Sequence, residues 1–133
     1  MTDFIGEYYL EDITVCDELV ELFNTSKTHE GICGHKVNKQ IKESTDYSIY
    51  PEQFHKIEKY FKELQKICDK YSEEYIWCDK YAPWSIIQPI NIQHYKPNQG
   101  YYAWHAERTC GEDPFRSRHL VFTTYLNDVE HQV

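Results

Sequence analysis

A single periodic stretch constrains the fold of this chain more than any other feature. After Pro51, apolar residues recur at alternating steps of three and four, which is the spacing of one face of an α-helix. The residues on this face are Phe54, Ile57, Phe61, Leu64, Cys68 and Tyr71. Pro51 itself suits the first turn of a helix. The spacing predicts a long amphipathic helix from Pro51 to about Tyr71, with a bent or broken continuation to Tyr81 and an apolar face that packs against a sheet.

A second, shorter helix is predicted near the N-terminus. Thr14 has the side chain of an N-cap residue, and Asp17 lies where the positive end of a helix dipole favours an acid. The apolar residues that follow at helical spacing are Cys16, Leu19, Val20 and Phe23. We expect a helix from about Val15 to Asn24. Residues 1–11 are expected to form a short strand or an extended arm, and residues 25–50 a loop with one short extended piece at most.

Strands are predicted in the second half of the chain. After Pro83, Ile90 and Ile92 alternate with polar residues, which predicts a strand from Ser85 to Tyr95. Pro89 indicates an edge position or a bulge in this strand. Composition divides the rest of the chain into a turn at 96–100, an extended piece from Tyr101 to Glu107, a loop at 109–117 and, from His119 to Leu126, a strand buried on both faces.

Helices that precede strands indicate an α+β chain in which helices lie on a sheet. The 133 residues suit one domain, with a helical support region at 1–82 and the strands at 83–133. A sheet that begins near residue 85 has room for about three or four strands, which is thin for a closed antiparallel core. Its last strand would leave an exposed edge through which copies of the chain could pair. We therefore expect a truncated fold.

Charge and composition argue against several classes of partner. Lys and Arg number 14 and Asp and Glu number 22, so the formal net charge is −8, which argues against nucleic acid and anionic membrane surfaces. No apolar run approaches the roughly 18 residues of a membrane-spanning helix, and the first residues lack the pattern of a secretory signal. The five cysteines include no CxxC pair, which favours reduced thiols in the cytoplasm.

The residues with the clearest chemical potential are His105 and Glu107. They stand two positions apart at the end of an extended piece, so both side chains can point to one side of the backbone. Imidazole plus carboxylate is two thirds of the facial triad that holds non-haem Fe(II). The third ligand is missing, and His131 is one candidate for it. A surface ion pair is the alternative interpretation. Cys33 and His35 give a weaker zinc pattern, because no second ligand pair stands at a suitable spacing.

The sequence around this motif has a recognisable pattern. The segments NIQHYKP, GYYAWHAER and SRHLVFTTYLNDVE follow one another between residues 91 and 130. They resemble the first half of the 2-oxoglutarate- and Fe(II)-dependent dioxygenases of the prolyl 4-hydroxylase-like group, and they are particularly similar to its bacterial and phage-type members. The resemblance is specific over about residues 85–130. It implies a double-stranded β-helix, a jelly-roll relative of about eight strands backed by helices, of which this chain would hold the first strands.

The resemblance also implies roles for individual residues. His105 and Glu107 would bind the metal, Tyr95 and Thr124 the cosubstrate, and Trp104 and Arg118 the substrate. The implied cofactors are Fe(II), 2-oxoglutarate as cosubstrate and L-ascorbate. The implied activity is hydroxylation of a peptidyl proline or another protein side chain, in the host cytoplasm if the chain is phage-encoded.

Three departures from the family pattern leave a second hypothesis open. Glu107 stands where the family more often has Asp. The distal histidine of the triad would follow about residue 131, and the basic residue that pairs with the far carboxylate of 2-oxoglutarate lies beyond it. The alternative is therefore a catalytically inactive truncated fragment, or a binding module that keeps part of the iron site. A third and weaker hypothesis is a small zinc-binding interaction module that uses Cys33 and His35.

Overall fold

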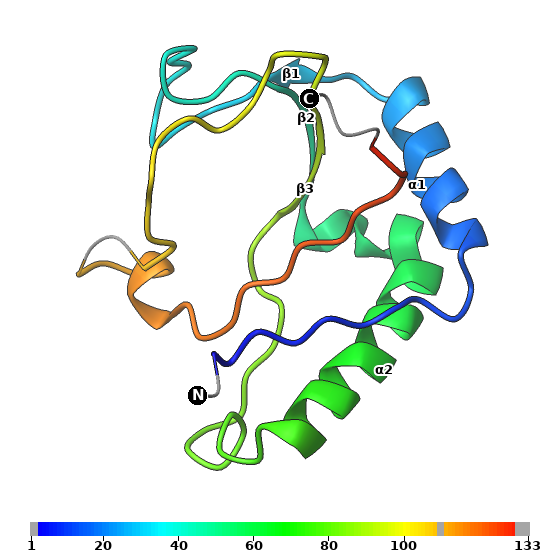
Figure 1. Cartoon of the computed structure of the whole chain (residues 1–133), viewed down its shortest axis with the longest axis vertical. Coiled ribbons are helices and arrows are strands. Elements are labelled where there is room, and N and C mark those ends of the chain that lie inside the picture. The colour runs from blue at the N-terminus through cyan, green and yellow to red at the C-terminus, as the bar shows by residue number, and fades with distance from the viewer. Residues whose placement is uncertain (1–2, 109–110, 130–133) are drawn as a thin grey trace.

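The computed structural model describes residues 3–108 and 111–129 (Figure 1). The elements in chain order are helix α1 (Thr14–Thr25), strands β1 (His29–Glu30) and β2 (Thr45–Ile49), the 3₁₀ helix η1 (Pro51–Ile57), helix α2 (Glu58–Glu74), strand β3 (Ile90–His94) and the short 3₁₀ helix η2 (Phe115–Ser117). The described part of the chain is thus a mixture of α and β structure, in agreement with the helices and strands expected from the sequence.

The strands form one antiparallel sheet in the order β1-β2-β3. β2 pairs with β3 along its whole length, with Thr45 opposite His94 and Ile49 opposite Ile90. The central strand therefore lies in a region where the sequence predicted a loop with one short extended piece at most. The sequence pattern of a strand was weak here because most residues of β2 are polar, namely Thr45, Asp46 and Ser48.

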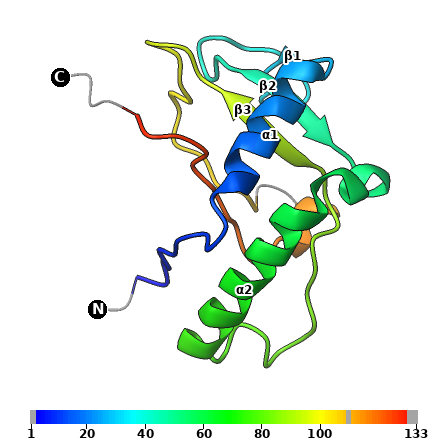
Figure 2. The ribbon, with the colours of Figure 1, turned by 90° about the vertical axis from the view of Figure 1, so that its right-hand side faces the viewer.

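The helices and the sheet enclose a small core. Figure 2 shows α1 lying over the sheet, with α2 beside it. Tyr47 and Ile49 project from β2 on one face, as the period of a strand requires. The buried residues that they meet come from α1, η1 and α2, and they are Val15, Leu19, Ile57, Tyr60 and Leu64. This packing confirms that the apolar face of the long helix lies against a sheet.

Both predicted helices are confirmed, with differences at their ends. The stretch from Pro51 begins with the 3₁₀ helix η1, continues as α2 and ends at Glu74, so the expected continuation to Tyr81 consists of turns. Thr14 is the first residue of α1 rather than its cap. The acceptor at this helix start is Asp12, whose Oδ1 lies 3.0 Å from the Thr14 amide nitrogen and 2.6 Å from its hydroxyl. Neither α-helix within the described ranges has the length and apolar character of a membrane span.

The N-terminal residues form the expected arm. The arm crosses α2 (Figure 1) and is held there by side chains of that helix. The buried carboxylate of Glu63 accepts hydrogen bonds from the amides of Glu11 (2.8 Å) and Asp12 (3.0 Å). The hydroxyl of Tyr71 donates to the carbonyl of Phe4 at 2.9 Å.

The strands predicted after residue 85 are shorter than expected or absent. The strand expected from Ser85 to Tyr95 is reduced to β3, which begins directly after Pro89 because proline has no amide hydrogen to donate to a ladder. The piece expected from Tyr101 to Glu107 contributes only an isolated bridge between Tyr101 and Lys42. The structure does not confirm a jelly-roll core within the described residues.

The segment from His119 to Leu126 differs most from its prediction. It is extended, but it belongs to no strand of the described sheet. Val121 is 63% exposed and Tyr125 is 82% exposed, so the prediction of a strand buried on both faces is wrong. Its apolar composition is typical of a strand, but composition alone does not provide a hydrogen-bonded neighbour on either side.

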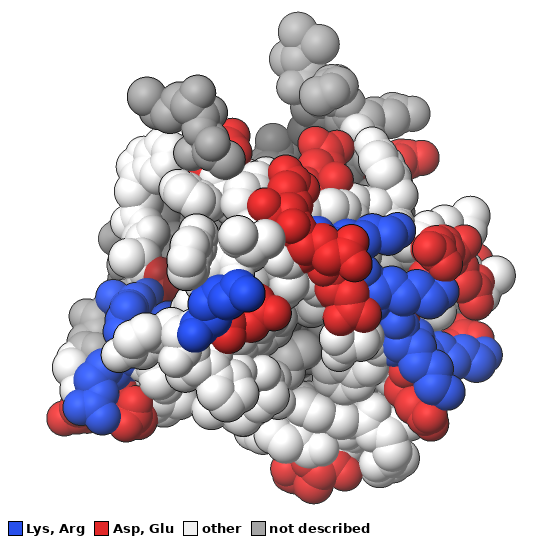
Figure 3. All heavy atoms as spheres, turned by 90° about the horizontal axis from the view of Figure 1, so that it is seen from below, with Lys and Arg blue, Asp and Glu red and all other residues white. Residues whose placement is uncertain are grey.

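Charged residues of both signs lie together on one face of the molecule (Figure 3). Figure 3 shows one face on which Lys and Arg side chains lie among Asp and Glu side chains. Opposite charges also pair along α2, where Lys62 contacts Glu58 at 3.0 Å and Lys66 contacts Glu63 at 2.6 Å. Mixed charges of this kind neutralise one another locally, so this face does not present a basic patch to a phosphate backbone.

Candidate metal centre

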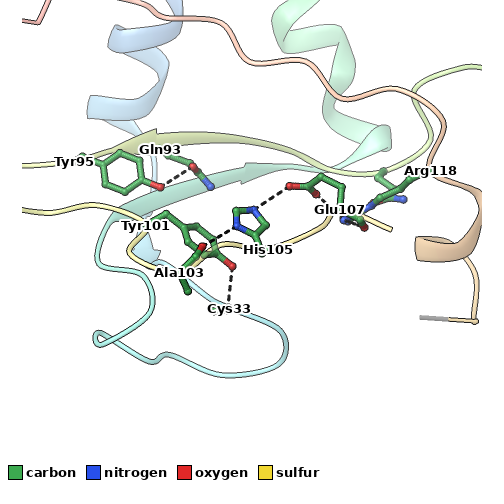
Figure 4. A network of polar contacts seen from close by, with 9 residues as sticks. Cys33, Gln93, Tyr95, Tyr101, Ala103, His105, Glu107 and Arg118 are labelled. Carbon is green, nitrogen blue, oxygen red and sulfur yellow. Dashed lines mark hydrogen bonds and ion pairs between the residues drawn. The ribbon is translucent and has the colours of Figure 1, made fainter. Parts of the chain in front are cut away.

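His105 and Glu107 face each other in the structure (Figure 4). The imidazole Nε2 of His105 lies 3.2 Å from Oε1 of Glu107, and the side chains are 42% and 43% exposed. The segment that carries them is fixed at its start by two backbone hydrogen bonds. The amide of Tyr102 donates to the carbonyl of Ile41 (2.7 Å), and the amide of Glu43 donates to the carbonyl of Gly100 (2.9 Å).

Two neighbours hold the imidazole of His105 in place. The ring of Tyr101 stacks on it, with centroids 4.0 Å apart and planes 18° from parallel. Nδ1 of His105 lies 3.2 Å from the carbonyl oxygen of Ala103. In the tautomer with hydrogen on Nδ1, this contact is a hydrogen bond to the carbonyl. That tautomer presents a lone pair at Nε2, as metal ligation through Nε2 requires.

In the other tautomer, Nε2 carries the hydrogen and donates to Oε1 of Glu107. The distance of 3.2 Å between Nε2 and Oε1 therefore accommodates either a direct hydrogen bond or a shared metal ion. Two ligand atoms that share one divalent metal at about 2.1 Å each, at a right angle, lie about 3 Å apart. The pair therefore fits the spacing of two neighbouring metal ligands.

Arg118 determines which oxygen of Glu107 is available. Its Nη1 lies 2.8 Å from Oε2 of Glu107 and 2.8 Å from the carbonyl oxygen of the same residue. Nε and Nη2 donate to Oε1 of Gln88 at 3.1 and 2.8 Å, and the guanidinium lies over the ring of Phe115, 4.8 Å from its centroid. Because Oε2 is occupied by Arg118, Oε1 is the oxygen left to face His105.

The donor set contains two of the three expected ligands. Within residues 3–108 and 111–129, no group of three His, Cys, Asp or Glu side chains is arranged to hold a metal ion. His131, the candidate third ligand, lies outside the described residues. The weaker zinc hypothesis gains no support for the same reason. The thiol of Cys33 instead lies 3.2 Å from the hydroxyl of Tyr101.

The other predicted site residues have different surroundings. The hydroxyl of Tyr95 donates to Oε1 of Gln93 at 3.1 Å, and burial, followed by the charge of Asp46, raises the pKa of Tyr95. The hydroxyl of Thr124 lies 2.8 Å from that of Tyr60, which belongs to α2. Trp104 is fully exposed next to His105. The structure thus brings Arg118 to the His105–Glu107 pair, whereas the described contacts of Thr124 lead to α2.

Sequence reasoning did not assign specific roles to Tyr101 and Gln88. Tyr101 was noted only as part of an aromatic cluster that could stack on a substrate, and it stacks on the imidazole. The hydrogen bond to Cys33 and then burial raise the pKa of Tyr101 to about 12, so it stays a neutral phenol beside His105. Gln88 gave no signal, because its contact with Arg118 joins residues 30 positions apart.

Comparisons with protein families, with curated proteins and with solved structures found no match to this chain.

Proposed function

We propose that this chain carries the first two iron ligands of a prolyl 4-hydroxylase-like, 2-oxoglutarate- and Fe(II)-dependent dioxygenase that hydroxylates a peptidyl proline or another protein side chain. The observation that supports the proposal best is the contact between His105 and Glu107. Nδ1 of the imidazole contacts a backbone carbonyl, and Nε2 faces a carboxylate oxygen at 3.2 Å. Two potential ligand atoms thus lie side by side in the pair for which the sequence pattern expects iron.

Each residue of the site has a definite task in this proposal. Fe(II) would be held by Nε2 of His105 and Oε1 of Glu107, and, when bound with 2-oxoglutarate, it supplies the oxidising chemistry. Tyr101 and the carbonyl of Ala103 keep the imidazole in one orientation. Arg118 keeps the carboxylate monodentate by occupying Oε2.

The remaining predicted residues stay part of the proposal. Tyr95 and Thr124 are proposed to contact the cosubstrate, and the exposed indole of Trp104 to contact the substrate. The described cysteines Cys16, Cys33, Cys68 and Cys78 are free thiols, which fits a reducing compartment such as the cytoplasm.

Anaerobic titration with Fe(II), with and without 2-oxoglutarate, tests the proposal. We expect the metal-to-ligand charge-transfer band of a 2-oxo acid on Fe(II) to appear with the unaltered chain and to disappear in His105→Ala and Glu107→Gln. His55→Ala is the matched control, because His55 is an exposed histidine on η1, and it should keep the band. Absence of the band from the folded unaltered chain, or its persistence in His105→Ala, would contradict the proposal.

A second candidate function is a binding module that keeps part of the iron site without turnover. Two observations favour it: within the described ranges no third ligand joins the pair, and Arg118 already occupies one oxygen of Glu107. The same titration separates the two candidates. Metal binding that depends on His105 but gives no charge-transfer band with 2-oxoglutarate would support the binding module and exclude the dioxygenase.

A further inference from the structure

The segment from His119 to Leu126 is extended but unpaired among the described residues. It runs extended across the molecule in front of the helices, as the orange-to-red trace in Figure 1 shows. No backbone hydrogen bond joins it to another described segment. Extended chain normally pairs its amides and carbonyls with a neighbouring strand, so this segment has the conformation of a strand but lacks the neighbour.

One face of this segment is already anchored. Leu126 packs against the core, and the hydroxyl of Thr124 lies 2.8 Å from that of Tyr60. At the start of the segment, His119 also contacts the carbonyl of Cys78 at 2.6 Å. The opposite face is open, because Val121 and Tyr125 are 63% and 82% exposed. The exposed residues Val121 and Tyr125 thus alternate with the half-buried Leu120, Thr124 and Leu126, although Phe122 is 41% exposed. The anchoring also means that the segment can receive a partner without first being ordered.

The composition of the segment favours pairing rather than preventing it. Edge strands that avoid association carry lysine, proline or a bulge. Residues 119–126 contain no Pro, Lys, Arg, Asp or Glu, although the whole chain has a net charge of −8. The run from Val121 to Tyr125 consists only of β-branched and aromatic residues, which are enriched in strands. Two copies of a strongly acidic chain can approach most readily through such an uncharged stretch.

We propose that residues 119–126 pair antiparallel with the same segment of a second copy of this chain, forming a twofold-symmetric dimer. Antiparallel pairing of identical segments is self-complementary, as a twofold interface requires. With Thr123 on the axis, Val121 of each copy lies opposite Tyr125 of the other. An aromatic residue opposite a β-branched residue is a favourable cross-strand pair, and symmetry provides it twice. On the inner face, the same register places Leu120 opposite Leu126.

This edge suits self-pairing better than the edge of β3. β3 begins directly after Pro89, which has no amide hydrogen to donate to a neighbouring strand. Its exposed residues are polar, namely Asn91, Gln93 and His94. The exposed edge that the sequence led us to expect would then be the segment after Arg118. The dimer proposal does not depend on the metal centre.

Sedimentation of the full chain from low to high micromolar concentration tests the dimer. Val121→Lys removes an apolar contact from both symmetric pairs and should raise the dimer Kd about tenfold or more. Thr123→Pro removes a central amide donor and should abolish the dimer. Val129→Lys is the matched control, since Val129 is also an exposed valine but lies outside the segment, and it should leave the Kd unchanged.

Hydrogen exchange at the two ends of the concentration range provides a second measurement. Amides of residues 119–126 should exchange quickly when the chain is dilute and slowly when it is concentrated. Circular dichroism identifies a variant that fails to fold, in which case the other variant decides. A chain that stays monomeric, a dimer that survives both substitutions unchanged, or amides that are protected at low concentration would each overturn the proposal.

Discussion

At the residue scale, Arg118 explains how an exposed glutamate can hold one orientation. The Glu107 side chain is 43% exposed, and a free glutamate of that exposure would sample many rotamers. Arg118 binds both its carboxylate and its backbone carbonyl at 2.8 Å, while Gln88 and Phe115 hold the guanidinium from the other side. The longer arm of glutamate, compared with the aspartate expected from the resemblance, is thereby constrained by a positioning residue.

Replacing Arg118 should weaken the metal binding proposed for His105 and Glu107. In Arg118→Gln we expect the affinity for Fe(II) or Co(II), measured without 2-oxoglutarate, to fall about ten- to hundredfold, because residues that orient metal ligands have effects of this size. Arg116→Gln is the control, since Arg116 pairs with Asp113 on the exposed surface. Co(II) absorption would report the altered ligand field. An affinity that is unchanged or increased in Arg118→Gln would contradict the positioning role.

A second residue-scale feature is the buried pair between Lys42 and Asp46. The two side chains are 4% and 3% exposed, and Lys42 Nζ lies 2.7 Å from Asp46 Oδ2. The hydroxyl of Ser44 donates to the other carboxylate oxygen at 2.7 Å. Gly31 lies directly against this group, since a Cβ there would come 2.1 Å from Ser44 Oγ. The charges beside the central strand are therefore fully paired and closely packed.

Removing one partner of this pair should destabilise the fold. Lys42→Met leaves a buried carboxylate without its cation, and we expect the free energy of unfolding to fall by about 3–5 kcal/mol. Adding Asp46→Leu should recover most of the loss, because both charges are then gone. Lys62→Met, which breaks the exposed pair with Glu58, should cost less than about 1 kcal/mol. Urea unfolding measures all of these variants, and a loss in Lys42→Met no larger than in Lys62→Met would contradict the expectation.

At the element scale, Glu63 joins the N-terminal arm to α2 and makes that contact sensitive to pH. The hydrogen bond from Lys66 and then the amides of Asp12 and Glu11 lower the pKa of Glu63 from 4.5 to about 2. A folded pKa below the unfolded one means that the unfolded chain binds more protons at intermediate pH. The stabilising effect of Glu63 is therefore fully present above about pH 4.5 and is lost as the pH falls towards 2.

Glu63→Gln should remove much of this pH dependence. In the unaltered chain, we expect the arm to become sensitive to an acid-active protease as the pH falls through the window between 4.5 and 2. In Glu63→Gln the arm should be sensitive already at neutral pH and change little on acidification. Glu52→Gln, an exposed substitution on η1, should behave like the unaltered chain. Equal protection of the arm in Glu63→Gln and the unaltered chain at pH 7 would contradict this role.

The elements also show what sequence patterns could predict and what they could not. α1 and α2 were predictable because a helix satisfies its hydrogen bonds locally and shows its buried face in the spacing of nearby residues. β2 was not predicted as a strand, since its buried Asp46 is balanced by Lys42, a compensation that no periodicity reveals. The segments at 101–107 and 119–126 were expected to be strands from composition, but strand pairing depends on distant residues.

The same difference between local and distant contacts decides which parts of the candidate site were predictable. His105 and Glu107 were predictable as a pair because a spacing of two residues can place both side chains on one side. The stacking of Tyr101 and the hydrogen bond to Ala103 depend on the path of an irregular segment. The contact between Arg118 and Glu107 joins residues 11 positions apart, with the helix η2 between them in the sequence, and no local pattern encodes it.

At the scale of the whole molecule, the parts of the chain differ in how far they are buried and hydrogen-bonded. β2 is the central strand and its residues Tyr47 and Ile49 are buried, and helices cover one face of its sheet (Figure 2). By contrast, much of the segments at 101–107 and 119–126 is exposed, and they make few backbone hydrogen bonds to described residues. Local opening should therefore cost much less free energy in these segments than in the sheet.

Native-state hydrogen exchange of the dilute chain should resolve this gradient. We expect the paired amides of β2 and the middle of α2 to exchange only through global unfolding, and residues 103–107 and 119–126 to exchange through small local openings. Denaturant dependence separates the two routes, because global opening exposes much more surface. Ile49→Val should accelerate exchange in β2 and α2 together and leave 103–107 nearly unchanged, since Ile49 is fully buried in the core. Uniform protection across all four segments would mean that the chain after residue 100 belongs to the same cooperative unit as the sheet, contrary to the arrangement described above.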